Sequence, residues 1–268
     1  MTRFLKLMLL TLSLFLPSLA TAGSIESNKS VLPLPEVATF TDGLERDLAA
    51  RGAQVAIVAR VGRDRAKLPV GIDYTHVAYW VYSKIEKADG TSYFGYQAYN
   101  LYQLADDLTR SKLVQDSPVD FFSGAHALEA GIIVPDRQVQ RKLLSVITSS
   151  TYAALHNNRY SVLANPRTGQ FQNCTEHTLD VLMASLYDTD SPEQIKANIS
   201  AHFDPQPIRI GALKRLLAPA ASAALTTSDH GSTIKTATFG SIARFMSKHD
   251  LSAQIYRYTP GGAKAFGI

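Results

Sequence analysis

The sequence has a single cysteine, a small excess of positive charge and no long apolar run beyond its first twenty or so residues. Hydrophobic residues make up 46% of the 268 positions and charged residues 19%, which excludes an intrinsically disordered chain. The lack of further apolar runs excludes a multi-span membrane protein. Lysine and arginine (27) barely outnumber aspartate and glutamate (23), and no basic block is interleaved with aromatic residues. We therefore expect no nucleic-acid partner.

The N-terminus has the three parts of an export signal. Residues 1–6 are short and basic, residues 7–16 are apolar, and Ala20, Thr21 and Ala22 form a small-x-small cleavage pattern. The apolar run is too short to span a bilayer comfortably. We therefore expect a signal peptide over residues 1–22, a periplasmic or secreted protein, and no stable transmembrane anchor.

Strand patterns concentrate in the first half of the chain and helix patterns in the second. The expected strands cover residues 55–61, 74–85, 93–102, 132–134, 160–164 and 233–238. The expected helices cover residues 41–52, 136–147, 174–187, a segment from 192 onward, and 241–246. Hairpins, rather than regular strand–helix alternation, predict an α+β fold with an antiparallel sheet packed against helices. No repeat or linker divides the chain, so we expect one domain over residues 41–268 after an N-terminal arm over residues 23–40.

Cys174 is the only thiol in the 246 residues that remain after removal of the first 22. It can form no internal disulfide, so it is either a buried apolar filler or a thiol kept for its reactivity. Leu179, Leu182 and Met183 follow it at helical spacing, and turn residues 165–169 precede it. This pattern places Cys174 in the first turn of a helix, where unpaired N–H groups favour a thiolate and lower the thiol pKa.

Seven histidines can supply a base for this thiol. His76 interrupts an apolar strand, and an imidazole buried there needs a polar partner. His177 follows Cys174 by three residues and is expected on an exposed helix face; without a second ligand pair at metal spacing, we expect no metal and no cofactor. His230, next to Asp229, is a reserve candidate, and the other histidines lie in polar or turn contexts.

The turn at residues 89–90 joins the strand of His76 to a second, tyrosine-rich strand. A two-residue turn places His76 opposite Gln103. A three-residue loop instead places Asn100 and Tyr102 on the His76 face. A slip of one residue reverses the face of every side chain, so Asn100 and Gln103 both stay open as the amide that orients the imidazole.

The stretches YTHVAYWV, YNLYQ and YSVLANPRTGQFQNCTEHTLDVL carry a resemblance to known families. A histidine strand followed by a later cysteine helix resembles the circularly permuted branch of the NlpC-type papain-like cysteine hydrolases. Over roughly residues 40–260 the chain resembles an exported bacterial family, domain of unknown function 2145, more closely still. The resemblance implies a permuted papain-like arrangement, with Cys174 as nucleophile, His76 as base and Asn100 as the third polar residue.

These observations predict an exported cysteine hydrolase or acyltransferase acting on an amide or an ester. His76 would take the proton of Cys174, and backbone N–H groups at the helix start, helped by Gln172 or Asn173, would hold the oxyanion. Export favours a small peptide, lipid or cell-wall substrate. The alternative is a non-catalytic periplasmic binding or assembly module on the same scaffold, with the tyrosines of the hairpin lining a ligand groove.

Overall fold

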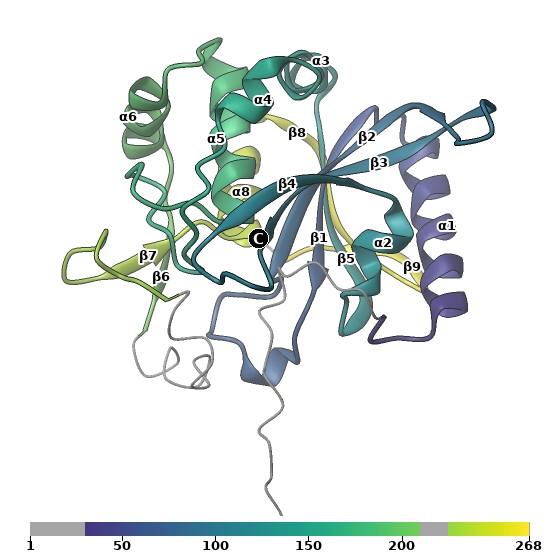
Figure 1. Ribbon diagram of the computed structural model, residues 1–268, viewed down its shortest axis with the longest axis horizontal. Helices are drawn as coiled ribbons and strands as arrows, with labels where there is room; N and C mark the ends of the chain where they lie inside the picture. The colour runs from purple at the N-terminus through teal and green to yellow at the C-terminus, as the bar shows by residue number, and fades with distance from the viewer. Residues whose placement is uncertain (1–29, 210–224, 268) are drawn as a thin grey trace, which may run out of the picture.

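A seven-stranded antiparallel sheet forms the centre of the computed structural model, which describes residues 30–209 and 225–267 (Figure 1). Its strands lie in the order β4-β3-β2-β1-β5-β8-β9. They are β1 (Val55–Val61), β2 (His76–Glu86), β3 (Ser92–Gln103), β4 (Ser111–Asp116), β5 (Ala127–Pro135), β8 (Ser252–Thr259) and β9 (Gly262–Ala265). The predicted α+β class with an antiparallel sheet is confirmed. The expected signal peptide lies outside the described residues, and among those residues no helix is long and apolar enough to cross a membrane.

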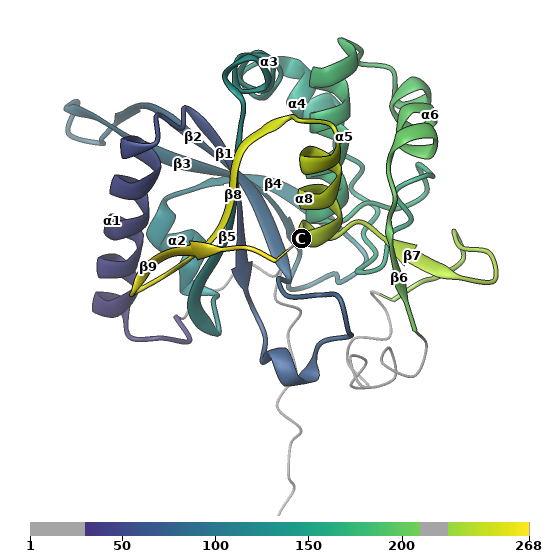
Figure 2. The same cartoon turned by 180° about the vertical axis from the view of Figure 1, so that it is seen from behind.

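Helices cover both faces of this sheet (Figures 1 and 2). The first face carries α1 (Leu34–Ala50) and α2 (Pro118–Ser123). The opposite side of the sheet carries α3 (Arg137–Ile147), α4 (Ser150–Ala154), α5 (Cys174–Tyr187), α6 (Pro192–His202) and α8 (Phe239–Lys248). A short helix η1 (Arg65–Lys67) lies in the loop after β1, and β6 (Gln206–Ile208) pairs with β7 (Ile234–Thr236) in a small second sheet.

The two covered faces explain the pattern of the central strands. Every residue of β1 is buried, because side chains that alternate along the strand enter a hydrophobic core on either side. In β2, Val77 and Tyr79 join the core under α5, whereas Ala78 and Trp80 join the core under α1 and α2. The same alternation fixes the side on which each polar residue of β2 lies.

The hairpin of β2 and β3 has the register of the three-residue-loop alternative. Paired residue numbers sum to 178, as in Tyr79 with Tyr99. Asn100 therefore shares the face of His76, and Gln103 points to the other face. The structure thus resolves the alternative that the sequence leaves open.

Several elements differ from the sequence prediction. Helix α1 begins at Leu34, within the segment expected to be an arm, and Thr41 lies inside it rather than at its cap. The Thr41 hydroxyl donates to carbonyls of the preceding turn, at 3.0 and 3.1 Å. Residues 160–164 form no strand, and Tyr160 makes only an isolated bridge to Gln172. Strands β4, β8 and β9 of the large sheet have no counterpart among the predicted elements.

Candidate active site

Helix α5 starts at Cys174, as the sequence predicts, because Asn173 caps it. The Asn173 Oδ1 accepts a hydrogen bond from the backbone N–H of Glu176 at 2.9 Å. The Cys174 side chain is 4% exposed and packs in a small apolar cluster with Leu101 and Tyr160. The nucleophile candidate is therefore held at a helix N-terminus against the sheet.

The Cys174 sulfur contacts the first turn of its own helix and the start of β2. The Thr175 hydroxyl lies 3.8 Å from the sulfur, and the backbone of Val77 lies near enough to favour the thiolate. The ladder between β2 and β3 ends at the Tyr79–Tyr99 pair, whereas β3 continues to pair with β4 as far as Gln103. The two strands thus separate at the level of Val77, and two stretches about a hundred residues apart meet here.

His76 is fully buried and directly precedes Val77 in β2. Its Nε2 lies 3.1 Å from Oδ1 of Asn100, and its ring stacks on Tyr102 with 4.9 Å between centroids. Phe121 of α2 covers the imidazole at 5.4 Å. The Nδ1 atom has no hydrogen-bond partner among the described residues. Asn100, not Gln103, is therefore the amide on the imidazole.

The imidazole and the thiol approach β2 from different sides. His76 and Val77 are consecutive in a strand, so the His76 side chain faces α2 whereas α5 packs on the opposite face. Within residues 30–209 and 225–267 no hydrogen bond joins the Cys174 sulfur to the His76 ring. The structure therefore gathers Cys174, His76 and Asn100 at one end of β2, with no direct bond from thiol to imidazole.

Burial sets the charge state of both groups. Burial lowers the pKa of His76 well below its usual value. The charge of Arg60, which pairs with His76 across β1 and β2, lowers this pKa further, whereas the hydrogen bond with Asn100 raises it. Burial likewise raises the pKa of the Cys174 thiol, although the Val77 amide, Thr175 and Arg60 all oppose the shift. The expectation of a lowered thiol pKa is wrong, because desolvation outweighs the helix N-terminus. The resting site holds a neutral thiol and a neutral imidazole.

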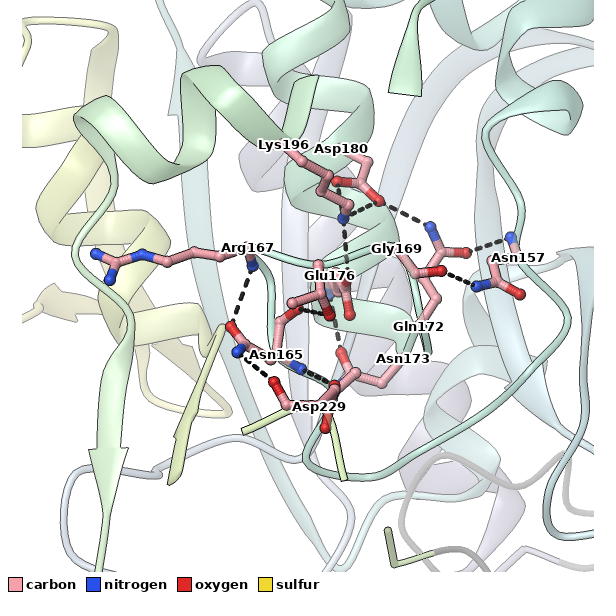
Figure 3. Close-up of polar contacts among 12 residues, drawn as sticks. Asn157, Asn165, Arg167, Gly169, Gln172, Asn173, Glu176, Asp180, Lys196 and Asp229 are labelled. Carbon is pink, nitrogen blue, oxygen red and sulfur yellow. Dashed lines mark hydrogen bonds and ion pairs between the residues drawn. The ribbon is translucent and has the colours of Figure 1, made fainter. Parts of the chain in front are cut away.

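Two side chains proposed as oxyanion donors are engaged elsewhere (Figure 3). The Gln172 Nε2 donates to Oδ2 of Asp180 at 2.9 Å and to the Leu155 carbonyl at 3.0 Å. The Asn173 Nδ2 donates to the Val162 carbonyl at 3.0 Å. Both amides support the loop and the helix start, which leaves backbone N–H groups of the first turn as the donors at this site.

A buried ion cluster follows on the next turns of α5. Lys196 of α6 places its Nζ 2.7 Å from both Glu176 Oε1 and Asp180 Oδ1 (Figure 3). Burial raises the pKa of Glu176 well above its usual range, against the attraction of Lys196, and also raises the pKa of Asp180. Two buried carboxyl groups share one ammonium, an arrangement that favours a proton on one of them.

His177 is buried, and its predicted place on an exposed helix face is wrong. Only 2% of the residue is exposed, and its ring packs edge-on against Tyr152 of α4 at 4.8 Å. Burial, with the charges of His156 and Lys196, lowers the pKa of His177 to about 3. Helices α4 and α6 cover the side of α5 that the sequence pattern predicts to be exposed. The spacing of residues within α5 does not predict this coverage.

The reserve candidate His230 has hydrogen-bond partners other than Cys174 and His76. The His230 Nε2 donates to the Leu163 carbonyl at 2.7 Å and lies 3.4 Å from Asp229. In the described part of the chain, no group of three or more histidine, cysteine, aspartate or glutamate side chains could hold a metal ion.

A family model described as an uncharacterized protein conserved in bacteria (DUF2145) matches residues 47–246, about three quarters of the chain, and this stretch contains Cys174, His76 and Asn100. No curated protein and no solved structure matches the chain.

Proposed function

The chain belongs to the bacterial family DUF2145, and from its site we propose that the protein is a cysteine-dependent hydrolase or acyltransferase that acts on an amide or an ester. Cys174 is the nucleophile, His76 the base and Asn100 the residue that orients the imidazole. One observation carries this proposal: His76 Nε2 is held by Asn100 at 3.1 Å while Nδ1 has no hydrogen-bond partner in the described part of the chain, and the next residue, Val77, has its backbone near the Cys174 sulfur.

In the proposed mechanism a proton passes first from the thiol to Nδ1 of His76, which requires the two groups to move into contact from their resting positions. The sulfur then forms a bond to the acyl carbon, and the amide or ester bond breaks as the imidazolium returns the proton to the leaving group. Water or a second nucleophile loses a proton to His76 and releases the acyl group from sulfur. Backbone N–H groups at the start of α5 hold the oxyanion in both steps.

The order of elements supports a circularly permuted, NlpC-type papain-like arrangement as part of the proposal. The histidine strand precedes the cysteine helix, and that helix packs its N-terminus on the sheet. The expected export signal at residues 1–22 favours peptidoglycan peptides or envelope lipids as substrates. This assignment depends on the expected compartment, not on the shape of a pocket.

Replacing Cys174 with alanine is expected to reduce turnover to the level of buffer alone. Wild-type protein and Cys174→Ala are assayed on a panel of cell-wall peptides and acyl esters, with His156→Gln as a control outside the triad. The alanine side chain has no atom that can form the acyl intermediate. Equal turnover by wild type and Cys174→Ala on every substrate that reacts contradicts the proposal.

A non-catalytic binding or assembly module is the second candidate, and two observations favour it. Cys174 is nearly inaccessible and its pKa is raised, as for a filler thiol. The hairpin of β2 and β3 also exposes Tyr82, Tyr93 and Phe94 to 43, 47 and 66%, respectively. Aromatic side chains exposed to this degree are available to a ligand or a partner.

The rate of Cys174 alkylation discriminates between the two candidates. Because the thiol is buried and its pKa is raised, we expect slow reaction with iodoacetamide at pH 7 and a rate that keeps rising above the usual thiol pKa. In the catalytic case the thiol reacts in the folded protein, and the rate stays nearly constant at urea concentrations below the unfolding transition. A rate that follows only global unfolding by urea identifies a filler thiol.

A further inference from the structure

The amide that holds His76 is itself held by a carboxylate. Asn100 Nδ2 donates to Oδ2 of Asp116 at 3.0 Å, and the Tyr102 hydroxyl donates to the same oxygen at 2.6 Å. Asp116 ends β4, two strands from His76, and the positive charge of Arg60 lies close by. The contacts therefore run in series from Asp116 through Asn100 to the imidazole.

The series has a direction, because Oδ2 of Asp116 accepts both hydrogen bonds, one from Asn100 Nδ2 and one from the Tyr102 hydroxyl. Asp116 therefore binds the NH2 end of the Asn100 amide, and the carbonyl end must face His76. A carbonyl oxygen only accepts, so Nε2 of His76 carries the proton. In a neutral imidazole the other nitrogen then has the free lone pair. Nδ1, the atom without a partner, is consequently the basic atom of the ring.

Reversal of the amide would remove this property. If Asn100 turned its NH2 group toward His76, Nε2 would have to accept and Nδ1 would carry the proton. Such a ring cannot take a proton from a thiol through Nδ1. The hydrogen bond to a charged acceptor is stronger than one between neutral groups, so Asp116 opposes this reversal.

We propose that Asp116 is a positioning residue that selects the Nε2–H tautomer of His76 and so keeps Nδ1 available as the base. This inference deepens the proposed function and rests on it for its catalytic meaning. The tautomer itself is a property of the resting protein and is measured without a substrate.

The test is a long-range ¹H–¹⁵N correlation spectrum of protein labelled with ¹⁵N-histidine, which distinguishes protonated from unprotonated ring nitrogens. The His76 signals are assigned by their loss in His76→Gln. In the wild type we expect the Nε2–H tautomer. Asp116→Asn keeps the shape of the side chain but permits either amide orientation, so the fraction of Nδ1–H tautomer should rise by about tenfold.

Two controls separate tautomer selection from general damage. Tyr102→Phe removes a second donor to Asp116 and leaves the Asn100 contact, so the tautomer should not change. Asp107→Asn alters an exposed carboxylate that binds Thr109, and should also have no effect.

A wild-type spectrum with the proton on Nδ1 overturns the inference, whether or not Asp116→Asn folds. So does a folded Asp116→Asn with the wild-type tautomer. Equal turnover by Cys174→Ala refutes the enzyme instead and leaves the tautomer result standing, since that substitution spares His76, Asn100 and Asp116.

Discussion

Replacing Lys196 with methionine is expected to lower the free energy of unfolding by about 3–5 kcal/mol, the usual cost of removing one partner from a buried ion cluster. Lys196 is 15% exposed at its side chain, and its two partners are 0 and 5% exposed. Methionine fills similar space but leaves Glu176 and Asp180 without a cation. For a chain of this size the melting temperature should fall by about 10 °C.

The matched control is Lys248→Met. Lys248 lies 3.9 Å from Asp204, and both side chains are well exposed, so loss of this pair should hardly change the melting temperature. A Lys196→Met protein as stable as Lys248→Met would show that the buried carboxyl groups need no counter-charge.

Acid should partly restore Lys196→Met. Without the lysine, the folded pKa values of Glu176 and Asp180 rise further above their unfolded values. The folded state then binds more protons than the unfolded state, so stability increases as the pH falls toward the ordinary carboxyl pKa. We expect the deficit relative to wild type to be smaller at pH 5 than at pH 8. An equal deficit at both values would assign the effect to lost packing of the lysine stem.

His177 is expected to make the fold sensitive to acid. Its folded pKa of about 3 lies below the ordinary value of 6.5, so the unfolded state binds the extra proton between these values. The stability that this neutral histidine permits is complete above pH 6.5 and is lost as the pH falls toward 3. The loss amounts to about 1.4 kcal/mol for each pH unit, or roughly 5 kcal/mol over the window.

Comparison of wild type with His177→Gln isolates this contribution, since the raised pKa of Glu176 acts in the opposite direction in both proteins. Chemical unfolding between pH 7 and pH 4 should show a steeper decline for wild type than for His177→Gln. His202→Gln, which replaces a histidine on the exposed side of α6, serves as the control and should keep the wild-type slope. Parallel lines for wild type and His177→Gln would contradict a buried neutral imidazole.

The sequence predicts the parts of the fold that local periodicity determines. Strand β1 has the predicted bounds, α5 begins at Cys174, and the hairpin turns at residues 89–90. Strands β4, β8 and β9 escape prediction because they lie toward the sides of the sheet and mix polar with apolar residues, so their pairing depends on neighbours distant in sequence.

The candidate site shows the same division between local and distant causes. The positions of Cys174 and His76 follow from their own segments. The choice of Asn100 over Gln103 depends on a register that the sequence pattern fits in two ways. The burial of His177 depends on α4 and α6, and the raised thiol pKa on the sheet packed against α5, so neither can be read from residues near them in the chain.

Helix α5 packs on β2 and β3 but starts about seventy residues after the end of β3. This separation affects the kinetics of folding. Closing so large a loop costs chain entropy before any contact between these elements is gained, so docking of α5 belongs to the late, slow part of folding. A chain that has emerged only as far as β4 holds His76, Asn100 and Asp116 but no thiol. Joint chemistry of Cys174 and His76 therefore begins only after α5 has docked on the sheet.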